Sequence, residues 1–137
     1  MIILAKVTLM SHLAEHEVFE RVGEAGFERI CAAFYSQVPA DDVLGPMYPA
    51  EDLPGAEQRL RDFLIYRFGG PATYIQQRGH PRLRARHMPF RIDALARDRW
   101  MKMMRKALED AEIDAAAQLT LLSFFEHMSD FLKNADE

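Results

Sequence analysis

The chain has 137 residues, of which 49% are hydrophobic and 28% are charged, and its formal net charge is −4. This length favours a single domain over residues 1–137, and the hydrophobic content excludes a disordered chain. The acidic charge argues against a protein that coats nucleic acid with its whole surface, and a single cysteine, Cys31, excludes an intrachain disulfide. The low cysteine content fits a reducing, cytoplasmic setting. We expect no membrane partner, because no apolar run approaches the roughly 20 residues of a membrane span.

Helical spacing recurs along the chain, whereas the sustained alternation expected of strands is absent. Residues 1–11 are apolar but are interrupted by Lys6, so we interpret them as an N-terminal extension and not as a targeting peptide. Apolar residues at steps of three and four then predict a helix over 23–38, which Pro39 ends. A proline-rich corner follows this helix.

Three further helices are predicted downstream. A helix over about 55–68 should end at a Gly-Gly-Pro run, where glycine permits a left-handed cap. Asp93 is expected to cap a helix over 94–111, and Asp114 a helix over 115–133. The predicted apolar stripe of the last helix comprises Leu119, Leu122, Phe125, Met128 and Leu132. These patterns together predict an all-α protein.

A short segment, PRLRARHMPF, begins at Pro81 and holds three arginines and one histidine. Pro81 suits the first turn of a helix and Pro89 disfavours helical geometry just before it, so 81–87 can form roughly two turns. Leu83 lies one turn before His87, and its carbonyl can accept the ring N–H of that histidine. An imidazole backed by a leucine and flanked by arginines suits haem, whose iron takes an imidazole and whose propionates take arginine.

Two other interpretations of these patterns stay open. A haem-free helical interaction module would account for the apolar stripes equally well. A small RNA-binding domain would bind in a strongly salt-dependent manner through the arginines of this region, which are Arg78, Arg82, Arg84, Arg86 and Arg91. The acidic net charge counts against the RNA-binding interpretation.

Three aromatic side chains with a polar hydrogen lie on separate predicted elements. Tyr35 is on the stripe of the first long helix, Tyr48 is in the proline-rich corner, and Trp100 is on the stripe of the 94–111 helix. Taken singly, each is explained by an ordinary role in the core. If they converge, their O–H and N–H groups would stabilise a dioxygen that takes negative charge from ferrous iron, at about 1 kcal/mol for each bond.

Taken together, these residues resemble the group II truncated haemoglobins of the two-on-two globin family. The resemblance runs from about residue 22 to residue 100, and it rests on FERICAAFYSQV, LGPMYPAEDLPGAEQRLRDFL, FGGPATYIQQRGHPRLRARHMPF and the tryptophan of RDRWM. It implies a truncated globin, an all-α two-over-two helical sandwich around haem b (iron protoporphyrin IX).

The resemblance also implies roles for eleven residues. His87 would be the proximal iron ligand, and Tyr35, Tyr48 and Trp100 would form the distal polar group. Ala56 stands where many globins have a distal histidine, and its methyl group cannot donate a hydrogen bond. The remaining expected cofactor contacts are Leu60, Phe63, Leu83 and Phe90, which would pack on the haem, and Arg59 and Arg86, which would meet its propionates.

A haem protein of this kind binds dioxygen, carbon monoxide and nitric oxide. Oxygen storage or transport, nitric oxide dioxygenation and peroxidase-like chemistry are all compatible with the resemblance, so the sequence leaves open whether the chain is an enzyme. The predicted donors favour tight retention of oxygen, because they act mainly on its dissociation. Redox turnover would require an external reductase, since the chain carries no flavin or nicotinamide motif of its own. The sequence allows a monomer or a homodimer.

Overall fold

The structure is a computed structural model that describes residues 13–72, 76, 79 and 82–135. In this part of the chain every regular element is helical, which confirms the predicted all-α class. The long helices are α2 (Val18–Tyr35), α3 (Leu53–Arg67), α6 (Ala94–Asp110) and α7 (Ala115–Leu132). The short elements are η1 (Glu15–Glu17), η2 (Val38–Ala40), η3 (Gly45–Met47), η4 (Ala50–Asp52) and α5 (Leu83–His87).

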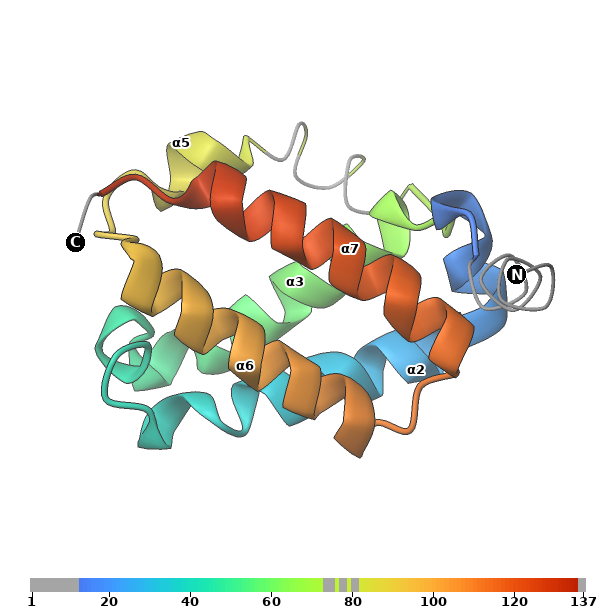
Figure 1. Ribbon diagram of the computed structural model, residues 1–137, viewed down its shortest axis with the longest axis horizontal. Coiled ribbons are helices and arrows are strands. Elements are labelled where there is room, and N and C mark those ends of the chain that lie inside the picture. Colours follow the sequence, from blue (N-terminus) through green and yellow to red (C-terminus); the bar gives the residue numbers. More distant parts are fainter. Residues whose placement is uncertain (1–12, 73–75, 77–78, 80–81, 136–137) are drawn as a thin grey trace, which may run out of the picture.

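The long helices pack as two pairs. α2 lies against α3 and α6 lies against α7, while α2 also contacts both helices of the second pair. Figure 1 shows α6 and α7 lying across α2 and α3, with α5 beside the C-terminal end of α7. This is the two-over-two arrangement that the resemblance to truncated haemoglobins implies.

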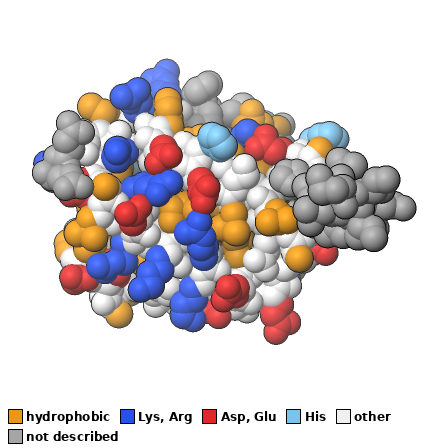
Figure 2. All heavy atoms as spheres, viewed as in Figure 1, with side chains coloured by type: hydrophobic (Ala, Val, Ile, Leu, Met, Phe, Trp, Pro, Cys, Tyr) orange, Lys and Arg blue, Asp and Glu red, His pale blue; other side chains and the backbone are white. Residues whose placement is uncertain are grey.

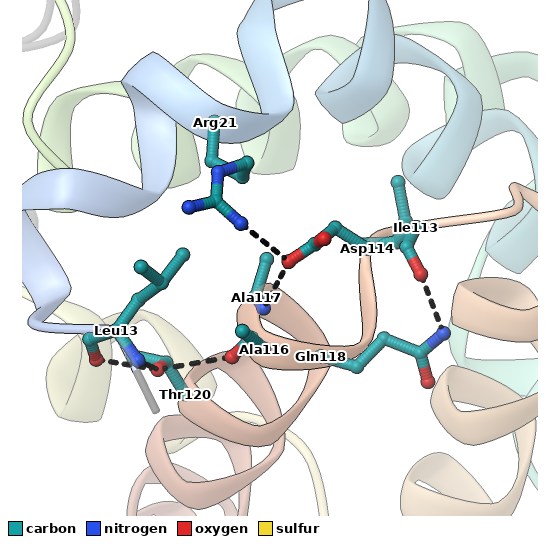
Figure 3. Close-up of polar contacts among 8 residues, drawn as sticks. All are labelled: Leu13, Arg21, Ile113, Asp114, Ala116, Ala117, Gln118 and Thr120. Atoms are coloured by element: carbon teal, nitrogen blue, oxygen red, sulfur yellow. Dashed lines mark hydrogen bonds and ion pairs between the residues drawn. The ribbon is translucent and has the colours of Figure 1, made fainter. Parts of the chain in front are cut away.

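Both predicted N-terminal caps are confirmed. The side chain of Asp93 accepts a hydrogen bond from the backbone N–H of Ala96 at 2.9 Å, which starts α6. Asp114 does the same for the N–H of Ala117 at 3.1 Å, and it also pairs with Arg21 of α2 at 3.1 Å (Figure 3). A capping carboxylate that also binds a guanidinium fixes the start of α7 against α2.

The end of α3 also follows the prediction. Gly69 adopts a left-handed φ of 100°, and the N–H of Gly70 donates to the carbonyl of Ile65 at 2.8 Å. A Cβ at Gly69 would collide with the backbone carbonyl of His16, so only glycine fits there. This glycine cap lets η1 approach the end of α3.

Two predicted helix boundaries were wrong. The helix predicted over 23–38 ends at Tyr35, because Val38 already belongs to a 3-10 helix. Its predicted start coincides with a kink at Gly23, where φ is 75° and a short helical stretch from Val18 joins it. The helix predicted over 81–87 begins only at Leu83, because Arg82 adopts a left-handed φ of 48° that no helical turn accommodates. Pro81 lies outside the described residues.

The predicted apolar stripe of α7 was wrong in one respect. Leu119 is 45% exposed, and Leu121 and Phe124 are buried in its place. The reason is that α7 faces two sides at once, since Leu121 packs into the core whereas Phe125 and Met128 border a cavity described below. A single apolar stripe cannot describe both buried sides of α7, and the predicted stripe therefore includes the exposed Leu119.

A series of ring contacts runs through the core. Consecutive rings have centroids 5.0 to 6.3 Å apart, and most pairs meet at a steep angle, as aromatic pairs prefer. In order of contact, the rings are those of Phe19, Phe27, Phe68, Phe124, Phe125, Trp100, Phe34, Tyr35 and Tyr48. The rings of three candidate site residues are thereby fixed by the buried core.

The surface mixes both signs of charge. Figure 2 shows acidic and basic side chains interspersed over the face formed by α6 and α7, where Arg105 pairs with Glu126 at 2.6 Å. This face is not the continuous basic surface that nucleic acid requires. Among the described residues, no helix is both long enough and apolar enough to cross a membrane.

Candidate functional site

A cavity of about 450 Å³ lies among α3, α5, α6, α7 and the segment that follows α2. Cavities of this size and apolar character are typical of small-molecule and cofactor sites. The structure brings all eleven residues singled out from the sequence to its wall, namely Tyr35, Tyr48, Ala56, Arg59, Leu60, Phe63, Leu83, Arg86, His87, Phe90 and Trp100. Residues up to 65 positions apart in the sequence thus line one cavity.

The ring of His87 is oriented by its own helix. Its Nδ1 atom lies 2.6 Å from the carbonyl oxygen of Leu83, one turn back, which confirms the contact predicted from the spacing. A carbonyl can only accept, so Nδ1 is the donor in this contact, and in the neutral ring Nε2 is the nitrogen with a free lone pair. Histidines that ligate a metal are commonly held in this way.

Tyr35, Tyr48 and Trp100 gather at another part of the wall. Tyr35 is 8% exposed, and its ring meets that of Tyr48 edge to face. Burial raises the pKa of Tyr48, while side-chain hydrogen bonding with Tyr35 and Trp100 lowers it. Burial, followed by the nearby Tyr48, raises the pKa of Tyr35 well above its usual range. Both phenols therefore stay protonated and can donate hydrogen bonds at neutral pH.

The segment that carries Tyr48 is tied to the helix that carries Trp100. The carboxylate of Asp41 accepts from the N–H groups of Val43 at 3.0 Å and Leu44 at 2.7 Å, and it pairs with Arg99 at 2.6 Å. Burial acts to raise the pKa of Asp41, but these hydrogen bonds outweigh it and hold the pKa below its usual value. Since Arg99 is adjacent to Trp100, this ionised carboxylate links the two parts of the polar group.

The arginines at the cavity differ in their surroundings. Arg59 forms an ion pair with Asp52 at 2.7 Å, and its side chain is 43% exposed. Arg86 is exposed on α5 and also lines the cavity. Arg97, which the sequence did not single out, lines the cavity from α6 and lies 3.0 Å from Asp130. Guanidinium groups at the edge of an apolar cavity suit a ligand whose carboxylates reach the surface.

Sequence reasoning missed several residues of the wall. Phe125, Met128 and Leu132 were predicted on an apolar stripe but were interpreted as core, and periodicity alone cannot separate those two cases. The wall also contains Ala96, which was predicted only to face inward, and residues for which no cavity role was predicted, among them Leu44, Met47, Ile92, Arg97, Phe124 and Ser129. His80, the second histidine of the short segment, lies outside the described residues.

The wall fits haem. One imidazole, whose Nδ1 contacts its own helix, lines a largely apolar cavity whose wall also contains arginines and the hydrogen-bond donors Tyr35, Tyr48 and Trp100. This set of groups matches what a porphyrin iron, its propionates and an iron-bound ligand require.

Comparison with known proteins agrees with this geometry. Residues 17–134 match the sequence model of the family described as Bacterial-like globin. The chain is 34% identical over 118 residues to "Group 2 truncated hemoglobin 3-1" of Lotus japonicus. This match covers 84% of this chain and 70% of the relative. It is similar to the structure of a thermostable hemoglobin from Thermobifida fusca, with 47% identity, a TM-score of 0.82, and coverage of 88% and 98% of the two chains.

A third similar structure is that of a truncated oxygen-avid haemoglobin from Bacillus subtilis. It is 30% identical, with a TM-score of 0.81, and the match covers 85% of this chain and 98% of that one. The chain therefore belongs to the bacterial-like globin family, whose members are haem proteins that bind diatomic gases, and within that family it is a group II truncated haemoglobin.

Proposed function

We propose that the cavity binds haem b, with Nε2 of His87 as the iron ligand. The observation that carries this proposal is the hydrogen bond of His87 to the Leu83 carbonyl, because it leaves a basic nitrogen next to an apolar cavity. Leu60, Phe63 and Phe90 would pack on the macrocycle. Arg59 and Arg86 would bind the propionates, and Arg59 would divide its donors between a propionate and Asp52.

The second part of the proposal concerns Tyr35, Tyr48 and Trp100. When bound, haem would supply a site for diatomic ligands and the electron transfer that their conversion needs. The three side chains would donate to a bound ligand and slow its release, which favours retention over delivery. The oxygen-avid description of the similar Bacillus subtilis haemoglobin supports this reading. Retention suits nitric oxide dioxygenation or peroxidase-like chemistry better than oxygen transport, and an external reductase would restore the ferrous form.

A haem-free helical module is the weaker alternative. Protein interiors are close-packed, and a domain without a cofactor would fill an internal space lined by Leu60, Phe63 and Phe125 with side chains. The observed cavity therefore favours a bound group over a purely structural role.

Titration with haemin tests the cofactor. The purified chain should take up one equivalent, and the reduced product should show a Soret band that shifts when carbon monoxide is added. Stopped-flow mixing of the oxygenated protein with nitric oxide then tests the reaction, with nitrate as the expected product. A chain that gains no Soret band beyond that of free haemin contradicts the proposal.

A further inference from the structure

Asn134, the only asparagine in the chain, follows the last turn of α7 and bonds to the segment after α5. Its side-chain oxygen accepts from the N–H of Ile92 at 2.8 Å. Its side-chain nitrogen donates to the carbonyls of Phe90 at 2.9 Å and His87 at 3.3 Å. Its backbone N–H donates to the carbonyl of Ile92 at 2.9 Å. One residue thereby bonds to four backbone groups of the stretch from His87 to Ile92, and the His87 carbonyl also accepts from the N–H of Phe90 at 3.0 Å.

These bonds hold a segment that packing alone holds poorly. Met88 is 58% exposed and Phe90 is 42% exposed, so few apolar contacts anchor the chain between α5 and α6. α5 is itself only five residues long, too short to be a stable helix without outside contacts. The amide of Asn134 supplies such contacts, because it offers both an acceptor and donors to adjacent backbone groups.

The bond from Asn134 to the carbonyl of His87 connects this set of hydrogen bonds to the candidate site. The Leu83 carbonyl fixes the rotation of the imidazole ring, while Asn134 fixes the backbone from which the ring projects. The two constraints are independent, since the first lies within α5 and the second comes from the C-terminal end of α7. Together they determine where Nε2 stands in the cavity.

We propose that Asn134 is a positioning residue for His87, one that sets the distance and tilt at which the imidazole meets the haem iron. This inference rests on the proposed function, because it assumes that His87 is the iron ligand. Without the amide, α5 would shift relative to the cavity, and the bond between iron and imidazole would become weaker and more variable.

The test compares two amide deletions. Asn134→Ala removes the three side-chain bonds and keeps the backbone bond to the Ile92 carbonyl. Gln118→Ala is the matched control, because the Gln118 side chain donates to the Ile113 carbonyl at 2.8 Å in the remote corner between α6 and α7 (Figure 3). Resonance Raman spectra of the ferrous proteins report the stretching frequency of the iron–histidine bond. We expect this band to move to lower frequency or to broaden in Asn134→Ala and to stay unchanged in Gln118→Ala.

A second readout needs no haem. Amide hydrogen exchange of Ile92 in the haem-free chain should accelerate about tenfold in Asn134→Ala, which corresponds to the loss of one hydrogen bond, and should be unaffected in Gln118→Ala. Asn134→Asp keeps the acceptor for Ile92 but lacks the donors for His87 and Phe90. It should therefore shift the Raman band while leaving Ile92 protected.

The outcomes separate this inference from the proposed function. A native chain that takes up no haem overturns the proposed function, and the inference with it. A haem-loaded native chain whose Raman band is the same in Asn134→Ala overturns only the inference, and in that case faster exchange at Ile92 would assign Asn134 a purely structural role.

Discussion

The rings of Tyr35 and Tyr48 meet edge to face, with centroids 5.6 Å apart and planes at 82°. Burial raises the pKa of Tyr48, whereas the polar groups of Tyr35 and Trp100 both act to lower it, so Tyr48 is the shared member of the polar group. The packing of Tyr35 and Trp100 against Phe34 fixes the other two rings. Any ligand that enters this part of the cavity therefore meets donors whose positions are already set, at no cost of ordering them.

Removal of the indole N–H should weaken the retention of oxygen. Trp100→Phe keeps an aromatic ring against Phe34 and Phe125 but loses one donor, so oxygen release should accelerate by about tenfold. Stopped-flow displacement of oxygen by carbon monoxide measures this rate. An unchanged rate would remove Trp100 from the group of residues that retain the ligand.

The effects of changing Tyr48 and Trp100 should not add. Because the polar groups of the two side chains influence one another, the increases in release rate caused by Tyr48→Phe and Trp100→Phe should not multiply. The double variant should release oxygen more slowly than the product of the two single increases, with a coupling free energy of about 1 kcal/mol. Tyr66→Phe is a matched control, because Tyr66 lies on α3 outside the wall of the cavity. Strict additivity would show that the two donors act independently.

Asp41 should stabilise the protein in a pH-dependent way. Asp41→Ala leaves the N–H groups of Val43 and Leu44 without their acceptor, so the free energy of unfolding at neutral pH should fall by about 2 kcal/mol. Because the folded pKa of Asp41 is lowered, its contribution is present above the pKa of the unfolded chain and is lost as pH falls through the folded pKa. The difference between variant and native protein should therefore shrink in acid.

Urea unfolding at neutral and at acidic pH measures this difference. Asp110→Ala serves as the control, because Asp110 forms an exposed pair with Lys106 within α6, and such pairs contribute only a few tenths of a kcal/mol. Equal losses in the two variants, or a difference that persists in acid, would contradict the assigned role of Asp41.

Cys31 should be inert in the folded protein. Burial, the largest cause, raises the pKa of its thiol to about 12, so almost no thiolate exists near neutral pH. A thiol reagent at mildly alkaline pH should react only at the rate of unfolding and should react fully in denaturant. Since the folded pKa is raised, the same group should destabilise the fold as pH rises above the unfolded pKa. Rapid reaction without denaturant would contradict the buried position.

The sequence predicted best those features that depend on neighbours within one helical turn. The caps at Asp93 and Asp114 and the bond from His87 to the Leu83 carbonyl are of this kind, because three or four residues of helix determine the geometry. The resemblance brought together the cavity residues, which no local rule could have done.

The features that the sequence did not predict depend on contacts between distant residues or on rare backbone conformations. Leu119 continues a regular apolar pattern, yet it is exposed. Its exposure depends on the rotation of α7 about its own axis, and only the packing of the other helices determines that rotation. Asn134 bonds to residues 42 to 47 positions away, and a lone asparagine after a helix gives no sign of this in the sequence. The start of α5 was misplaced because the left-handed backbone of Arg82 is rare for an arginine.

The ligation of haem iron by His87 is tested most directly by the absorbance spectrum of ferrous His87→Gly, recorded before and after the addition of imidazole. The glycine variant should take up haem weakly and lack the five-coordinate ferrous spectrum of the native protein, and free imidazole should restore much of that spectrum by occupying the vacated space. A native spectrum in the variant without imidazole would place the iron ligand on another residue.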